Sequence, residues 1–125
     1  MHLIYNNNLT SLYNRDAKVF DIWIKQNRIG YVGIFKDEDK DFVGVHIDEE
    51  YRGKGYIKGA YKLLVKELNL NELWASIKYY NKASLRAHRK MKFKYIRLEG
   101  NDTFIFHKRY LFRTIRNWIV SWCKS

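Results

Sequence analysis

Residues 47–57 read Ile47-Asp48-Glu49-Glu50-Tyr51-Arg52-Gly53-Lys54-Gly55-Tyr56-Ile57 and join a strand-like run to an amphipathic helix. The two glycines permit a tight turn and a close approach of the backbone to a ligand. The N–H groups that open the helix have no acceptor within it, and the helix dipole adds positive charge beside them. Arg52, Lys54 and Lys58 bring full charges to the same point. The stretch predicts a phosphate site; an ordinary glycine turn is the alternative.

The sequence on both sides of this turn has clear periodicity. Phe42–Ile47 is apolar and β-branched, which is typical of a strand, and an apolar stripe from Ile57 to Leu68 follows the 3.6-residue period of a helix. The turn lacks the Gly-Lys-Ser/Thr ending of a Walker loop and the third glycine of the dinucleotide fingerprint. A phosphate site here therefore belongs to another class.

The remaining elements extend this unit in both directions. Further strands are expected at Leu3–Tyr5, Val19–Lys25, Ile29–Lys36, Leu73–Ile77, Phe93–Leu98 and Thr103–His107. Further helices are expected near Leu9–Tyr13, at Asn81–Met91, and along an apolar stripe from Leu111 to Trp122. A strand meander, then strand–helix–strand–helix, then strands predicts an α/β (α+β) domain with helices packed on a sheet.

Composition sets the broad class of protein. The chain has 125 residues, 46% of them hydrophobic, which suits one compact domain and excludes a low-complexity chain. The single cysteine, Cys123, excludes an internal disulfide framework and an all-cysteine zinc site, and no metal site is expected. No apolar run approaches the roughly 20 residues of a transmembrane helix. A soluble cytoplasmic protein, with no signal peptide or transmembrane segment, is expected.

The formal net charge of +11 is unevenly distributed. Residues 78–97 contain eight basic residues and no acidic one, and residues 108–125 contain five more basic residues and again no acidic one. A one-sided basic surface favours an anionic partner such as a nucleotide, a nucleic acid or an anionic lipid; solubility alone is the alternative.

Two motifs resemble those of a known family. Residues 47–57 resemble motif A of the GCN5-related N-acetyltransferase (GNAT) superfamily, written Arg/Gln-x-x-Gly-x-Gly/Ala. Asn81-Lys82-Ala83-Ser84, continuing to Phe93, resembles motif B, which is Asn-x-x-Ala/Ser followed by Tyr and then Gly-Phe. The resemblance covers about residues 19–108. It implies a single GNAT-like domain, with a central mixed, mostly antiparallel sheet flanked by helices. This domain is expected to span residues 1–125, and the basic amphipathic helix expected within residues 109–125 lies beyond the family core.

The resemblance implies an N-acetyltransferase that uses acetyl-CoA as its co-substrate. In such a protein the amides of residues 53–58 hold the coenzyme's diphosphate, the Ile47 amide meets the thioester carbonyl, and Asn81 contacts the pantetheine arm. The coenzyme-binding residues that the resemblance implies are Ile47, Arg52, Gly53, Lys54, Gly55, Tyr56, Ile57, Lys58, Asn81 and Ser84.

Three residues are candidates for proton transfer. His88 stands where motif B has its tyrosine, near the sulfur of the coenzyme in relatives, and a histidine can give or take a proton at neutral pH. A packing histidine is the alternative. His46 and Asp48 end the central strand, and strand alternation puts both on one face, as candidate bases or as solvated turn charges.

Three positions depart from the family pattern. Ile57 stands in place of a small residue, Lys92 in place of the glycine before Phe93, and His88 in place of the tyrosine. These departures support an alternative function, a catalytically degenerate GNAT-fold protein that serves as a nucleic-acid- or protein-binding module.

The acceptor amine has no direct signature. In relatives the acceptor is recognised mainly by helices between the first two strands, whereas here only Asn6–Lys18 fills that place. An open acceptor side favours a macromolecule, a protein or an RNA. Part of the basic half is expected to serve the phosphates of coenzyme A, for which Lys82, Arg86, Arg89 and Lys90 are well placed. The basic tail, residues 108–125, has three competing interpretations, which are packing on the domain or in a homodimer, contact with nucleic acid, and contact with a membrane surface.

Overall fold

The computed structural model describes residues 1–13 and 16–111. Its elements are β1 (His2–Tyr5), α1 (Asn7–Tyr13), β2 (Lys18–Ile24), β3 (Asn27–Asp37), β4 (Lys40–Ile47), a short 3₁₀ turn (Glu49–Tyr51), α2 (Tyr56–Glu67), β5 (Glu72–Lys78), α3 (Lys82–Lys90), β6 (Lys94–Glu99) and β7 (Thr103–Arg109). The expected order of strands and helices is confirmed up to β7. The C-terminal helix predicted within residues 109–125 falls almost wholly outside the described residues.

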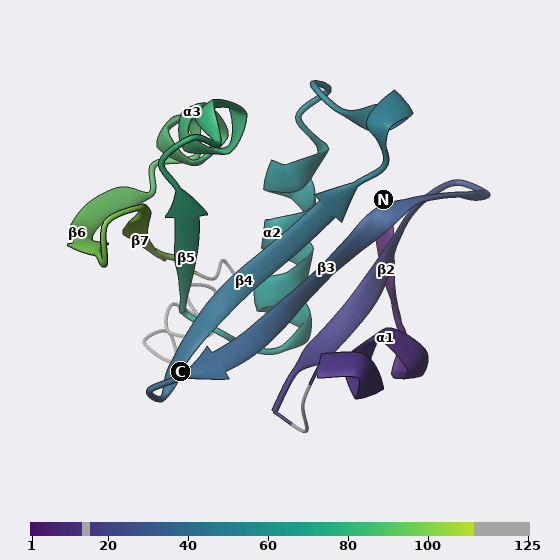
Figure 1. The fold of residues 1–125 in the computed structure, drawn as a ribbon. Helices are drawn as coiled ribbons and strands as arrows, with labels where there is room; N and C mark the ends of the chain where they lie inside the picture. Colours follow the sequence, from purple (N-terminus) through teal and green to yellow (C-terminus); the bar gives the residue numbers. More distant parts are fainter. Residues whose placement is uncertain (14–15, 112–125) are drawn as a thin grey trace, which may run out of the picture.

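The seven strands form one sheet in the order β1-β2-β3-β4-β5-β7-β6 (Figure 1). All neighbouring strands pair antiparallel except β4 and β5, which are parallel. The expectation of a mixed, mostly antiparallel sheet flanked by helices is therefore confirmed.

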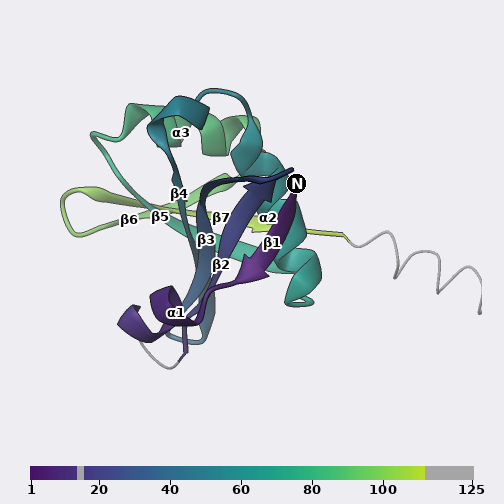
Figure 2. The same ribbon diagram turned by 90° about the vertical axis from the view of Figure 1, so that its right-hand side faces the viewer.

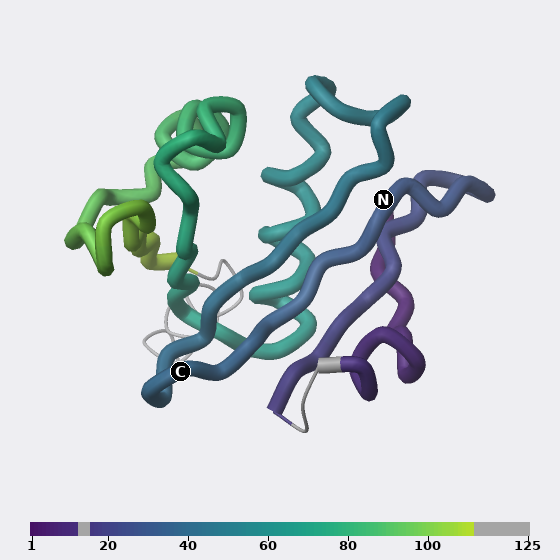
Figure 3. Tube along the Cα trace, in the orientation of Figure 1, coloured from purple at the N-terminus to yellow at the C-terminus, as the bar shows by residue number. Residues whose placement is uncertain are grey.

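The parallel pair β4–β5 is joined at one point only. Phe42 and Trp74, both near the start of their strands, are the single register pair between them. Figure 1 shows β4 and β5 beginning together and diverging toward their arrowheads. The Cα trace in Figure 3 shows that the turn into α2 and the connection from β5 to α3 both lie at this diverging end. The fold therefore brings both sequence motifs to one edge of the sheet.

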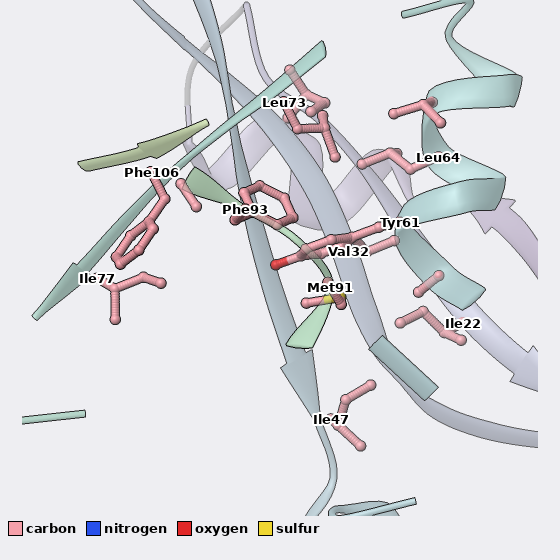
Figure 4. Packing of buried hydrophobic residues seen from close by; sticks show 14 of the residues in the cluster. Ile22, Val32, Ile47, Tyr61, Leu64, Leu73, Ile77, Met91, Phe93 and Phe106 are labelled. Carbon is pink, nitrogen blue, oxygen red and sulfur yellow. The ribbon is translucent and has the colours of Figure 1, made fainter. Parts of the chain in front are cut away.

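The hydrophobic core lies between the sheet and the two longer helices. The α2 residues Ala60, Tyr61, Leu64 and Val65 are buried, as the helical stripe predicted. Figure 4 shows Tyr61 extending from α2 toward Met91 and Phe93, which follow α3, and its ring lies 5.9 Å from that of Phe93. One aromatic side chain thus links both helices to the core.

The end of α3 accounts for the missing glycine of motif B. The Phe93 amide donates to the His88 carbonyl at 3.0 Å, and the Lys92 amide donates to the Arg89 carbonyl at 3.0 Å. This bond pair is the Schellman motif, which requires a left-handed residue, and Lys92 supplies it with φ 72°. The turn that glycine makes in relatives is made here by a lysine at a conformational cost.

The first helix is short. α1 has seven residues, and Figure 2 shows it at the opposite end of the sheet from α3. None of the helices in residues 1–13 and 16–111 is long and apolar enough to cross a membrane.

Candidate functional site

The turn before α2 has the geometry of an anion site. Gly53 and Gly55 adopt φ values of 75° and 77°, and nothing lies within 4 Å of the place where a Cβ would sit on either glycine. Gly55 is the N-cap of α2 and makes no side-chain cap. The N–H groups of the first helical turn therefore begin beside open space, as phosphate binding requires. Lys54 and Lys58 are exposed beside this turn.

The Arg52 side chain connects this turn to the end of β4 through a hydrogen bond. Its Nε donates a hydrogen bond to the Ile47 carbonyl at 2.7 Å. This contact uses one of the five N–H donors of the guanidinium and leaves the others for an anion. Arg52 thus has a positioning role that the motif alone does not indicate.

The end of β4 presents an unpaired backbone edge toward β5. The Asp48 amide donates to the Ile29 carbonyl of the preceding strand at 2.8 Å, and backbone polar groups alternate sides along a strand. The backbone groups of Ile47 and Val45 therefore point away from β3, in agreement with the bond from Arg52 to Ile47. Because β5 pairs with β4 only at Phe42, these groups meet no strand partner. On its β5 side, this end of β4 therefore carries backbone groups that no strand pairs.

Asn81 and Ser84 open α3 at the same end of the sheet. The Asn81 side-chain oxygen accepts a hydrogen bond from the Ser84 amide at 3.2 Å, which makes Asn81 the N-cap of the helix. Substitution of such a cap by alanine typically costs about 1 kcal/mol. Asn81 therefore has a structural role in addition to any contact with a ligand.

His88 lies in the core between α2 and α3, with 4% of its surface exposed. Its Nδ1 lies 2.8 Å from the Ser84 carbonyl, which can only accept, so Nδ1 carries the proton. Nε2 then accepts from the Tyr61 hydroxyl at 2.9 Å. Burial lowers the pKa of His88, although the Ser84 carbonyl opposes that shift, and burial raises the pKa of Tyr61. His88 is a neutral histidine whose two nitrogens are both engaged.

His46 and Asp48 are brought together on the sheet face opposite Ile47. The Nε2 of His46 lies 3.2 Å from Oδ1 of Asp48, with 43% and 36% of the two side chains exposed. The Tyr31 ring stacks on the His46 ring at a centroid distance of 5.2 Å. The shared face follows from strand alternation. The structure therefore separates the three candidates into an accessible pair and one core histidine.

Two side chains at these sites have no sequence signature. Tyr61 belongs to the apolar stripe of a helix and is indistinguishable from other core residues there. Tyr31 meets His46 only because of the antiparallel register between β3 and β4, in which these two residues are partners. Within the described part of the chain, no group of three His, Cys, Asp or Glu residues could hold a metal ion.

Comparisons with known proteins agree with this geometry. A family model described as an acetyltransferase (GNAT) domain matches residues 4–94. The chain therefore belongs to the GNAT family of acetyltransferases, whose members transfer an acetyl group from acetyl-CoA to an amine. Comparison with the sequences of curated proteins gives no match.

Several solved structures share the fold. An N-acetyltransferase, PseH, from Campylobacter jejuni in complex with acetyl-CoA has 19% identity and a TM-score of 0.68, over 82% of this chain and 74% of that one. The ribosomal L7/L12 α-N-protein acetyltransferase RimL with coenzyme A has 16% identity and a TM-score of 0.68, over 82% and 68%. The microcin C7 self-immunity acetyltransferase MccE with acetyl-CoA and AMP has 19% identity and a TM-score of 0.66, over 82% and 67%.

Proposed function

We propose that this N-acetyltransferase binds acetyl-CoA between β4 and β5 and transfers the acetyl group to an amine of a macromolecule, a protein or an RNA. The observation that carries the coenzyme site is the single β4–β5 register pair, because it leaves the backbone edge of Val45 and Ile47 open beside the anion turn. The macromolecular acceptor is supported by the short α1, which lies at the opposite end of the sheet from α3, so that this helix leaves the diverging end uncovered.

The coenzyme supplies the activated acetyl group and the thiolate leaving group. Around it, the amides of residues 53–58 and the charges of Arg52, Lys54 and Lys58 bind the diphosphate. The Ile47 N–H, which points toward β5, would donate a hydrogen bond to the thioester carbonyl of the bound coenzyme. Ile57 packs partly against the core, so its branched side chain leaves the turn open.

We propose that His46 is the general base that removes the proton from the acceptor amine. The ring is accessible, is stacked on Tyr31, and is held by Asp48 at 3.2 Å, an arrangement that suits a general base. In contrast, the Nε2 of His88 already accepts the Tyr61 hydroxyl inside the core. The exposed His46 ring is accessible to an incoming amine, whereas the buried His88 ring is not.

The first experiment measures acetyl-CoA binding by calorimetry and then acetyl incorporation into host proteins and RNA by mass spectrometry. We expect binding, and a mass increase on a macromolecule. Binding without any acetylated product would support the degenerate binding module instead, and absence of binding contradicts the proposal.

The second experiment tests the base. The substitution His46→Ala removes general-base catalysis and should lower kcat/KM by about 10²–10⁴-fold, while acetyl-CoA affinity stays the same. Asp48→Asn should give a smaller loss, because the ring stays in place. His2→Ala, at an exposed histidine of β1, serves as the control. Equal activity of the His46 and His2 variants contradicts the assignment.

A further inference from the structure

A cavity of about 380 Å³ lies beside α3, within the stretch that resembles motif B, but it does not include the motif residues Asn81 and Ser84. It is lined by Tyr79, Lys82, Leu85, Arg86, Arg89 and Phe104. Leu85 is buried and Phe104 is half-buried, so the cavity has an apolar floor, while the three cations stand around it.

The helical period places this cavity on one flank of α3. Lys82, Arg86 and Arg89 are four and three residues apart and share that flank. Ser84 and His88, also four residues apart, face the other way, toward Tyr61 of α2. The cavity therefore opens on the β7 side of α3, away from α2.

A second basic concavity lies near the other end of the hairpin formed by β6 and β7. It measures about 330 Å³ and is lined by Lys92, Lys94, His107, Lys108 and Arg109. Burial lowers the pKa of Lys108, and the charges of Lys58 and Lys62 add to that shift. Cations are thus crowded together on this side of the molecule.

These cations are poorly neutralised by the chain itself. Lys78 pairs with Asp102, and Arg97 pairs with Glu99. Within residues 1–13 and 16–111, six further cations of this region make no ion pair: Lys82, Arg86, Arg89, Lys90, Lys92 and Lys94. Neither cavity has an acidic residue in its lining. We therefore expect a negatively charged partner from outside the chain to bind this region.

Exposed aromatic rings stand among the cations. Tyr79 and Tyr80, which follow β5, are 51% and 65% exposed and meet edge to face at a centroid distance of 5.5 Å. Tyr95 of β6 is 55% exposed. Aromatic platforms beside a positive groove are the pattern of proteins that bind single strands by stacking bases and contacting phosphates.

We propose that α3, Tyr79 and the β6–β7 hairpin form a binding surface for single-stranded nucleic acid. Arg86, Arg89 and Lys82 contact phosphates, and the apolar floor beside Tyr79 receives a base. A surface built only to attract an acidic protein needs no such platform. The inference goes beyond the proposed acetyl transfer and does not depend on it, because binding is measured without turnover.

The test uses the whole chain and a fluorescent single-stranded RNA of about 16 nucleotides, with binding followed by anisotropy over a range of salt concentrations. The substitutions Arg86→Glu and Arg89→Glu together should reduce the slope of log K against log salt by about 1.4, because two phosphate contacts are lost. Lys18→Glu with Lys66→Glu changes the net charge equally at exposed positions elsewhere and should have little effect. Tyr79→Ala should weaken binding about tenfold and leave the salt slope unchanged.

Four results would overturn the inference. The first is absence of binding at low salt, and the second is an equal loss in the two charge-reversal pairs. The third is equally tight binding of poly-glutamate, which would assign the surface to an acidic protein. The last is full displacement of the RNA by saturating coenzyme A, which would place the RNA in the coenzyme site. Calorimetry with acetyl-CoA, run on the same samples, tests the acetyltransferase proposal separately.

Discussion

His88 illustrates how one residue can have two opposite interpretations. In the motif it replaces a tyrosine near the reacting atoms, whereas in the fold it joins two helices through the Tyr61 hydroxyl and the Ser84 carbonyl. The sequence does not indicate which residue contacts His88, because Tyr61 lies 27 positions earlier on another helix. Only the packing of α2 against α3 brings the two rings together.

The buried histidine predicts a pH dependence of stability. The pKa of His88 lies below its ordinary 6.5 in the folded chain, so the unfolded chain binds the extra proton. The stability contributed by neutral His88 is complete above pH 6.5 and is lost as pH falls toward the lower folded pKa, by at most about 1.4 kcal/mol per pH unit. Urea titrations at pH 7.5 and pH about 5.5 measure the effect.

The matched variant for this prediction is His88→Gln, which retains hydrogen bonding but does not titrate. It should be less stable at neutral pH and should lose less stability between the two pH values. Equal pH dependence in the two proteins would assign the effect to other groups. The carboxyl groups of Glu72 and Asp102 have pKa values below their ordinary 4.5 and 3.8, so they titrate under more acidic conditions.

A substitution at Lys92, unlike the one at His88, is predicted to make the folded chain more stable. Its φ of 72° is left-handed, which costs an L-residue roughly 1–2 kcal/mol and costs glycine almost nothing. Lys92→Gly should therefore raise the free energy of unfolding by about 1 kcal/mol in a denaturant titration. Lys92→Ala removes the charge but keeps the strain, so it should be close to the natural chain. A glycine variant no more stable than the alanine variant would show that the backbone relaxes at this turn.

At the scale of elements, the turn before α2 combines a left-handed backbone at its glycines with open space around them. Gly55→Ala would place a methyl group in open space at φ 77°, with no clash and with a backbone penalty of about 1–2 kcal/mol. We expect weaker acetyl-CoA binding in calorimetry, because the methyl group enters the space beside the helical N–H groups. Gly100→Ala, at φ 62° in the β6–β7 turn, carries a similar strain far from this site and serves as the control. Equal affinities in the two variants would contradict the anion site.

Most elements could be predicted because their signals are local. The apolar period of α2, the alternation in β4 and the glycine turn each lie within about a dozen residues, and alternation alone put His46 and Asp48 on one face. Strand order could not be predicted in this way. Whether β7 lies between β5 and β6, and how far β5 follows β4, depends on contacts among distant residues such as Phe42 and Trp74.

At the scale of the whole molecule, the sheet consists of two antiparallel groups, β1–β4 and β5–β7–β6, joined by one parallel contact and by the shared core under α2 and α3. A ligand between β4 and β5 touches both groups and should stabilise the entire fold. At about 100 times its Kd, acetyl-CoA should add about 2.7 kcal/mol to the free energy of unfolding, seen as a higher Tm by calorimetry. An unchanged Tm at a high acetyl-CoA concentration would show that the folded chain does not bind the coenzyme.

The uneven charge also belongs to this scale. The basic residues of α3 and the β6–β7 hairpin lie on one of the two strand groups, whereas His46 and Asp48 lie on the other. In the fold, the diverging end of β4 and β5 lies between the basic surface and the pair of His46 and Asp48, a relation that the sequence does not indicate. A polyanion held on one side would thus lie next to the edge at which acetyl transfer is proposed.

The open edge of β4 has a consequence for the dynamics of single amide hydrogens. In β4, the amides of Gly44 and His46 face β3, whereas those of Val45 and Ile47 face the gap. Hydrogen–deuterium exchange followed by NMR should therefore alternate along the strand between slow and fast residues. On addition of acetyl-CoA, the two fast amides should become slow while the slow ones hardly change, so that neighbouring protons of one strand report separately on the fold and on its ligand.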